Sequence, residues 1–342
     1  MTRRARIFAA IAVVIVLVVG GCYTAYWFIV AGRIEKIIDR WVDDQRHAGF
    51  TVEFERGPVW GFPVDFRATF HRPHIAGEIA GKPFDWRGPD VTLSVSPIDL
   101  QGISLSGPGH HTLDLGSGPA QVDATALSAR LAYDGSTLQS FLTVKFSGLR
   151  VILPDGKTVA AASGEASLTS GPQPKVDSDP LVQFAADAKD LKLPEGTVLL
   201  TADPLGEARI AGTVKGPMPL APLRQALASW RDAGGTVEVT DFAVTQATLS
   251  LSGSATVALD ANLQPIVAAD VRARGLAATI DLLASQRRIY PEDALKMKLF
   301  VKGAERDTRD GYKEVATGLT LQGGYLSWGP FKIAQVPPIA WP

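Results

Sequence analysis

The hydrophobic positions of this chain follow three successive patterns, and the first is an unbroken apolar run. Residues 7–31 contain no Asp, Glu, Lys, Arg or His, and Arg3, Arg4 and Arg6 precede them. A helix of about 25 residues at a rise of 1.5 Å each is about 37 Å long, which exceeds a hydrocarbon core of ~30 Å. Because basic flanks stay in the cytoplasm, we predict that residues 1–32 form a cytoplasmic cap and a transmembrane anchor.

Three interpretations of this segment remain open, and a retained signal anchor is the favoured one. Tyr23, Tyr26, Trp27 and Phe28 lie at the outer end of the run, where an aromatic belt would meet the lipid headgroups. A cleaved signal peptide would have a shorter apolar region and a small-residue cleavage site. In the third interpretation, the sequence Val19-Gly20-Gly21-Cys22 is a loose lipobox, and Cys22 is lipidated.

The second pattern, in residues 33–48, has the period of an amphipathic helix. Apolar side chains recur at three- and four-residue spacing, and charged residues fill the remaining positions. The apolar positions are Ile34, Ile37, Ile38, Trp41 and Val42. We predict a connecting helix that continues the anchor outward and covers the end of a sheet. Gly49 is expected to terminate this helix.

The third pattern begins at Phe50, where apolar and polar residues start to alternate. Period-two runs at residues 50–54, 64–70, 91–96, 103–106 and 142–147 predict antiparallel strands with one buried and one wet face. Prolines fall between these runs, where a missing backbone donor costs nothing. Residues 49–169 are therefore predicted to form a first β-rich domain.

The segment Ser170 to Pro180 is rich in Pro, Ser and Asp, so we expect a linker or long loop there. A second β-rich domain is predicted over residues 181–342, with helices near residues 220–232 and 279–302. Pro291 fits the first turn of the last helix, with two acidic residues beside it at the positive end of the helix dipole.

The longest alternating run is Ala247 to Asp260. Leu249, Leu251, Val257 and Leu259 share one face, and the opposite face carries mostly hydroxyl side chains. At ~3.3 Å per residue, fourteen extended residues reach roughly 46 Å. An apolar strand surface of that length needs a cover, which is a second sheet, a helix or a bound molecule.

The composition argues against a nucleic-acid-binding protein and against a disulfide-stabilised one. The 342 residues carry 34 basic and 35 acidic side chains and a net charge of −1, which gives no electrostatic basis for binding nucleic acid. A single cysteine excludes an intramolecular disulfide framework. The 33 Gly and 23 Pro are scattered through the chain, which favours many short strands joined by turns.

The chain resembles domain-of-unknown-function family 2125 in a few short motifs. These are the basic-capped apolar run, Trp60-Gly61-Phe62-Pro63, and Trp86 followed by the strand that ends at Ser94-Val95-Ser96-Pro97. The resemblance implies an exported or membrane-anchored protein of alphaproteobacteria with no established activity. The second half is also similar, more distantly, to the AsmA-like superfamily, in residues 249–260 and 324–330. That resemblance implies curved sheets with an apolar groove linked to phospholipid movement.

The sequence offers little for catalysis. His71-Arg72-Pro73-His74 and His110-His111 lack the Cys or acidic partners that would complete a metal site, so we interpret them as solvated loop histidines. The motifs of nucleophilic hydrolases, zinc proteases and phosphate-binding loops do not occur. We predict that the protein is not an enzyme and uses no cofactor.

The prediction is therefore a mainly β fold with a few short helices, in which long curved antiparallel sheets form a groove or a sandwich after one transmembrane helix. The body is expected in the periplasm, anchored in the bacterial inner membrane, with a phospholipid or acyl chain as partner. Candidate lipid contacts are Leu249, Leu251, Val257, Leu259, Trp60 and Trp328. The alternative is a non-enzymatic envelope scaffold whose core is filled by its own side chains, with Trp60, Trp86 and Trp328 as core aromatics.

Overall fold

The structure is a computed structural model that describes residues 3–79, 81–194, 205–287, 289–308, 311–328 and 331–341. Side chains are described from residue 18 onward, with the further exception of residues 331, 333 and 334. The basic cap and the first part of the apolar run therefore have no described side chains. The chain divides into two units, Met1–Pro119 and Ala120–Pro342.

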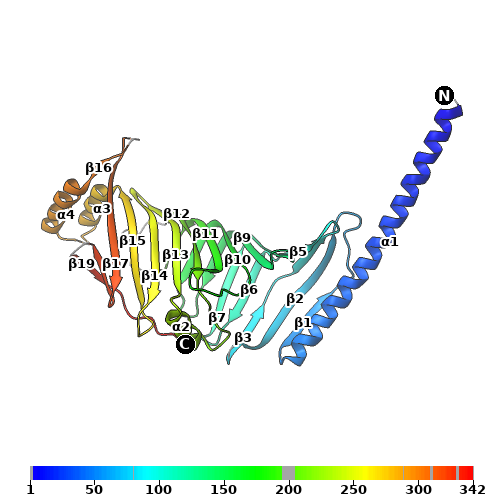
Figure 1. The fold of residues 1–342 in the computed structure, drawn as a ribbon, viewed down its shortest axis with the longest axis horizontal. Helices are drawn as coiled ribbons and strands as arrows, with labels where there is room; N and C mark the ends of the chain where they lie inside the picture. The colour runs from blue at the N-terminus through cyan, green and yellow to red at the C-terminus, as the bar shows by residue number, and fades with distance from the viewer. Residues whose placement is uncertain are drawn as a thin grey trace. The chain divides into compact units, whose positions relative to one another are not determined.

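Unit 1 is built around one long helix and an antiparallel sheet (Figure 1). Helix α1 (Arg3–His47) joins the predicted anchor and the predicted connecting helix without a break. Its second half lies against the sheet, and its first part extends beyond it (Figure 1). Gly49 follows the helix end with φ +92°, a backbone conformation that glycine adopts more easily than other residues.

The sheet of unit 1 is organised by one long strand. Its strands are β1 (Thr51–Arg56), β2 (Phe66–Ile79), β3 (Lys82–Arg87), β4 (Val91–Ser96), β5 (Asp99–Ser106) and β6 (Gly109–Asp114). Strand β2 pairs with β1 along one edge and with β4 and then β3 along the other. Strands β4 and β5 form a hairpin, and β6 pairs with β3. All of these pairs are antiparallel.

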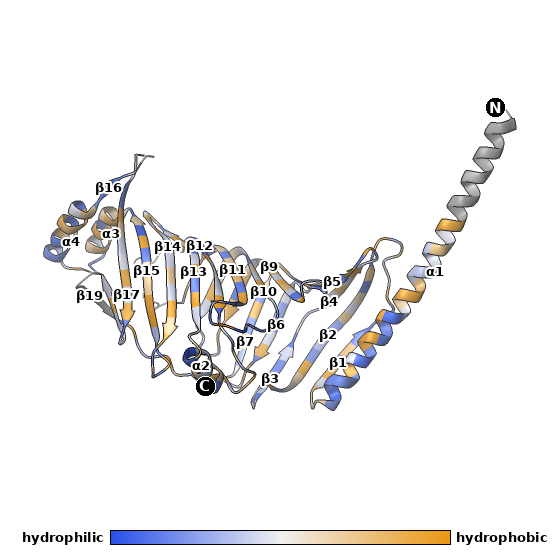
Figure 2. Cartoon of the chain, viewed as in Figure 1, coloured by the Kyte–Doolittle hydropathy of each residue, from blue (hydrophilic) through white to orange (hydrophobic). Residues whose placement is uncertain are grey.

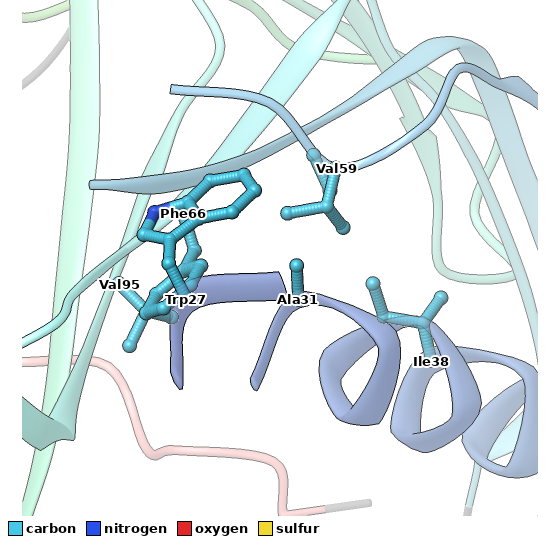
Figure 3. Packing of buried hydrophobic residues seen from close by; sticks show 7 residues of the cluster. Trp27, Ala31, Ile38, Val59, Phe66 and Val95 are labelled. Atoms are coloured by element: carbon cyan, nitrogen blue, oxygen red, sulfur yellow. The ribbon is translucent and has the colours of Figure 1, made fainter. Parts of the chain in front are cut away.

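The core of unit 1 lies between α1 and this sheet. Trp27, Ala31 and Ile38 on the helix pack with Val59, Phe66 and other side chains of the sheet side, as Figure 3 shows from close by. The Trp27 ring stacks on Phe66 with centroids 5.1 Å apart, and Trp27 is only 2% exposed. The interpretation of Trp27 as part of a membrane belt is therefore wrong, because its indole fills the core of unit 1.

Unit 2 is a meander in which neighbours in sequence are mostly neighbours in the sheet. Its strands are β7 (Pro119–Ala124), β8 (Ala126–Asp134), β9 (Gln139–Ile152), β10 (Thr158–Ser170), β11 (Pro180–Leu191), β12 (Leu205–Lys215), β13 (Thr236–Gln246), β14 (Leu249–Leu259), β15 (Pro265–Arg274), β16 (Arg306–Asp307), β17 (Lys313–Gln322), β18 (Tyr325–Trp328) and β19 (Phe331–Gln335). From β8 to β15 each strand pairs antiparallel with the next, and β17 to β19 continue the order after β15.

Three short helices accompany the strands of unit 2. Helix α2 (Leu223–Asp232) follows β12, and α3 (Leu276–Ser285) and α4 (Pro291–Ala304) lie between β15 and β16. They fall in the two regions where helices were predicted. Pro291 occupies the start of α4, with Glu292 and Asp293 in its first turn.

Two sequence-based boundaries differ from the structure. Residues 170–180 connect β10 to β11, which pair with each other, so this segment is a loop inside unit 2. The run expected as one strand from residue 247 to 260 is shorter: β14 has 11 residues, and Ala247 and Thr248 form the turn from β13. Ala247 has φ +50°, a conformation that its side chain does not favour, so the sequence gives no turn signal there.

The mainly β fold with a few short helices is confirmed. Along the strands of unit 2, apolar and polar residues alternate, as the bands of colour in Figure 2 show. Antiparallel sheets with this alternation have one apolar and one polar face.

Candidate functional site

The apolar face of unit 2 is continuous across ten paired strands. Residues directly opposite each other in an antiparallel sheet point to the same side, so a chain of pairings traces one face. One such row passes from β8 to β18 and contains no charged residue. Its members are Leu131, Leu142, Leu168, Phe184, Gly212, Val239, Ala255, Ala269, Leu319 and Trp328. With strands ~4.8 Å apart, the row extends roughly 43 Å.

The candidate residues of β14 belong to this apolar face. Leu251 lies opposite Val244 and Ala273, and Val257 lies opposite Val237 and Val267. Leu249 and Leu259 occupy the two ends of the same strand on the same side. Leu249 is 4% exposed, whereas the other three are half-buried. Trp328, three strands along in the row above, shares the face with them.

The face is open at one end and covered at the other. In β8, β10 and β12, Leu131 is 49% exposed, Leu168 45% and Ile210 41%. We call the apolar residues of β8 to β12 the open part of the apolar face. Further along, in β17, Val315 packs under Ile280, Ala294 and Val301 of the α3–α4 helix pair. Helices α3 and α4 therefore cover the far end.

Trp328 belongs to the covered end. Its ring meets Phe300 of α4 edge to face, with centroids 4.8 Å apart, and it packs against the cluster under the helix pair. An edge-to-face pair of this kind stabilises a packed core. Of the two interpretations of Trp328, the structure places it as a half-buried core aromatic beneath α4.

The opposite face of the same strands is ionic. Lys145 pairs with Glu165 at 3.0 Å, and Arg209 pairs with Asp241 at 2.8 Å. Each ion pair joins two adjacent strands, β9 to β10 and β12 to β13. Arg274 donates to Glu314 at 2.9 Å. These charges are partly solvated, so each pair contributes little stability. Their consequence is that one side of the sheet is wet and the other is the apolar face.

Three phenylalanines of the apolar face lie over glycines of the next strand. Phe146 is opposite Gly164, Phe184 opposite Gly212, and Phe242 opposite Gly253, once in each of three successive strand pairs. A Cβ built on these glycines would lie 2.4, 2.8 and 3.1 Å from the respective ring. We call these the Phe-over-Gly pairs. Aromatic rings that cover a glycine in this way compensate for its missing side chain.

The sequence reasoning missed these pairs. Each one has a signal, a phenylalanine in one period-two run and a glycine in the next, but the register between the runs is needed to join them. Register depends on turn lengths and bulges, such as the irregularity between Val239 and Phe242 opposite β14.

Trp60 belongs to unit 1 and is not part of this face. It makes an isolated antiparallel bridge with Arg67, is half-exposed, and carries the Arg67 guanidinium 5.1 Å from its ring centre. A cation over an indole face is a favourable contact of order 1 kcal/mol. The structure therefore brings the four β14 candidates and Trp328 together on one face and assigns Trp60 to a different unit.

The histidines lie on strands, so their interpretation as loop residues is wrong. His71 and His74 are in β2, which continues through Pro73 by means of an irregularity at Arg72, where φ is +49°. His71 contacts Asp90 at 2.7 Å, and this hydrogen bond lowers the pKa of the Asp90 carboxyl. His111 is 7% exposed in β6, bonds to the Gly107 carbonyl and stacks on Trp86.

Two further findings apply only to the part of the chain that the structure describes. No group of three or more His, Cys, Asp or Glu side chains is arranged there to hold a metal ion. Nor does that part contain a helix with the length and apolar character needed to cross a membrane. The predicted anchor begins at Ile7, and the side chains of residues 7–17 lie outside the described ones.

Comparison with known proteins gives a family and no activity. The family model described as "Uncharacterized protein conserved in bacteria (DUF2125)" matches residues 27–337. The chain therefore belongs to this family of conserved bacterial proteins. No curated protein and no solved structure matches the chain.

Proposed function

We propose that this protein binds a lipid acyl chain on the open part of its apolar face while the first part of α1 holds it in the bacterial inner membrane. The observation that carries the proposal is the apolar face that continues across ten strands, with Leu131, Leu168 and Ile210 on it about half-exposed. Large contiguous apolar patches are uncommon on soluble surfaces and mark sites of interaction.

The shape of the face suits an unbranched hydrocarbon. A row of apolar side chains that extends roughly 43 Å can contact an acyl chain along its length through dispersion and the hydrophobic effect. The Phe-over-Gly pairs keep aromatic rings against the sheet, so they present a broad apolar floor. The partner is therefore proposed to be a phospholipid or a free acyl chain, held without catalysis.

The anchor rests on the sequence. Residues 7–31 carry no ionisable group except Cys22 and the tyrosines, and Arg3, Arg4 and Arg6 come before them. Helix α1 runs through the whole segment. The positive-inside bias assigns the basic end to the cytoplasm and the sheets of both units to the periplasm. Cys22, which is exposed on α1, would lie within this span as a free thiol.

The scaffold alternative predicts a different degree of burial for the same residues. A core filled by the protein's own side chains would bury Leu168 and Ile210, whereas about two-fifths or more of each is exposed. Bringing that remaining surface into contact with lipid is worth roughly 1 kcal/mol per side chain, a fraction of the 1.5–3 kcal/mol for full burial. That is about fivefold in affinity for each residue.

The test is native mass spectrometry with lipid extraction on the full chain, purified in mild detergent. The full chain is needed because Trp27 and Ala31 belong to the core of unit 1. Leu168→Asn and Ile210→Asn probe the open part, and Leu251→Asn and Val257→Asn probe β14. Leu138→Asn is the control, since Leu138 is exposed at the β8–β9 turn, outside the face.

We expect lipid on the wild type and on the Leu138 variant, and less lipid on the Leu168 and Ile210 variants with little loss of stability. A polar group in a sealed core would instead cost about 1–3 kcal/mol. Wild-type protein without lipid, together with strong destabilisation by Leu168→Asn, would favour the scaffold and contradict lipid binding.

A further inference from the structure

Two turns of unit 1 meet α1 at the point where the helix leaves the sheet. One turn, residues 62–64, precedes β2, and the other, residues 97–98, joins β4 to β5. They lie at the same end of the sheet, because Phe66 at the start of β2 pairs with Val95 near the end of β4. The helix is tied to both turns: the Tyr23 hydroxyl donates to the Pro63 carbonyl, and the Tyr26 hydroxyl donates to the Pro97 carbonyl at 3.0 Å.

Apolar side chains project from this junction. Ile98 is 96% exposed and Val64 is 76% exposed, each at the tip of its turn. Phe62 and Phe28 are about half-exposed and stack on each other with centroids 6.1 Å apart. We call Phe28, Phe62, Val64 and Ile98 the apolar collar. Single exposed apolar residues are ordinary, but four gathered around one helix need an explanation.

We infer that the apolar collar inserts into the headgroup region of a lipid bilayer and sets how close unit 1 sits to the membrane. The inference rests on the proposed anchor, and it adds a second membrane contact made by the folded body. The collar and the apolar run are continuous, since the run ends in the helical turns that carry Tyr23, Tyr26 and Phe28.

The lengths favour insertion. Residues 7–22 precede the tyrosine that binds the first turn, and sixteen helical residues extend about 24 Å. A hydrocarbon core is ~30 Å thick, so this free part is about 6 Å too short to cross with unit 1 held above the surface. Interfacial apolar groups typically sink ~5–10 Å to the boundary of headgroups and acyl chains. Immersing the collar by that amount removes the mismatch.

The side chains around the collar also fit an interface. Tyr23 and Tyr26 have apolar rings and hydroxyls that hydrogen-bond to backbone, which is the chemistry of the aromatic belts at membrane surfaces. The belt predicted from residues 23–28 is thus replaced by a mixed one: Trp27 turns into the core, and Phe62, Val64 and Ile98 from the sheet side take its place at the surface.

The test uses the full chain with Cys22→Ser, so that one new cysteine can carry an environment-sensitive NBD fluorophore. The probe positions are Ile98→Cys and Val64→Cys. The control is Leu115→Cys, an equally apolar exposed residue just after β6, next to the far end of β2. About ten β2 residues at ~3.3 Å, or roughly 33 Å, separate it from the collar. Each protein is reconstituted into liposomes of phosphatidylethanolamine and phosphatidylglycerol, with or without doxyl-labelled lipid.

We expect the labels at positions 98 and 64 to emit at shorter wavelength than the label at position 115, and to be quenched by doxyl lipid when that label is not. A chain that floats with the liposomes but shows equal, unquenched emission at all three positions overturns the collar and leaves the anchor intact. A chain that does not float contradicts both. A blue shift without doxyl quenching that disappears on dilution would assign the collar to contact between two copies, and would overturn the lipid interface.

Discussion

Replacing Gly253 with alanine tests whether the Phe-over-Gly pairs are required by the backbone of the sheet. A Cβ at this position would lie 2.0 Å from the Asp270 carbonyl oxygen of β15 and 3.1 Å from the Phe242 ring. The ring can rotate away, but the carbonyl belongs to a paired strand, so β14 and β15 must separate locally. Gly253→Ala is therefore expected to destabilise unit 2 although alanine loses less backbone entropy than glycine on folding.

The magnitude follows from two opposing terms. Overpacking a well-packed site typically costs 1–3 kcal/mol, whereas a compatible Gly→Ala change contributes about 0.4–1 kcal/mol of stability through the unfolded state. The net loss should be roughly 1–2 kcal/mol. For a unit of this size, 1 kcal/mol corresponds to about 2–4 °C, so the midpoint should fall by roughly 2–8 °C.

Gly318→Ala is the matched control. Gly318 is on the neighbouring strand β17, opposite Asp270, and a Cβ there meets nothing closer than the Ala269 oxygen at 4.0 Å. This variant should be neutral or slightly stabilised. The assay is thermal unfolding of the full chain in detergent, with hydrogen exchange on peptides from β14 and β15 to locate the change.

A second variant separates the backbone from the ring. If the Asp270 carbonyl is the obstacle, adding Phe242→Leu to Gly253→Ala should not restore stability. Full rescue by the double change, or equal behaviour of Gly253→Ala and Gly318→Ala, would refute this reasoning.

Two further predictions concern unit 1. Trp27→Ala should lower its stability by about 3–5 kcal/mol, because a buried aromatic is lost from the core, while Phe28→Ala should change it by less than ~1 kcal/mol; hydrogen exchange of β2 peptides measures both. His71→Ala should raise the pKa of Asp90, which the His71 hydrogen bond lowers below its ordinary value of 3.8. A lowered folded-state pKa gives stability that is present above the ordinary value and is lost as the pH falls through the folded value. NMR titration of the carboxyl groups checks this, and Asp134, whose pKa is lowered by Ser136 and Thr137, should not move.

The sequence predicted the secondary-structure elements better than it predicted which elements lie next to each other. Period-two runs identified most strands and the fold class, because alternation is a local consequence of having one apolar face. Strand β2 was interrupted in the prediction at Pro73, which the structure accommodates at an irregularity beside Arg72. The β13–β14 turn was missed because Ala247 replaces the usual Gly, Asn or Asp.

The candidate site shows the same limit. The apolar character of β14 was visible in the sequence, but the row that continues it through Leu168 and Phe184 depends on register in every intervening hairpin. The burial of Trp27 could not be predicted from the sequence either. An aromatic residue at the end of an apolar helix can face lipid or protein, and only the packed sheet shows that its partner is Phe66.

The recurrence of the Phe-over-Gly pair in three successive strand pairs makes unit 2 modular. Each hairpin brings one ring and one glycine, and contacts mainly the hairpins before and after it. In such quasi-one-dimensional arrays, stability is approximately a sum of intrinsic and nearest-neighbour terms. Gain or loss of one hairpin would then lengthen or shorten the apolar face by about 10 Å, two strand spacings, without redesign of the remainder. The reach of the surface along a bound chain would be set by how many hairpins the gene encodes.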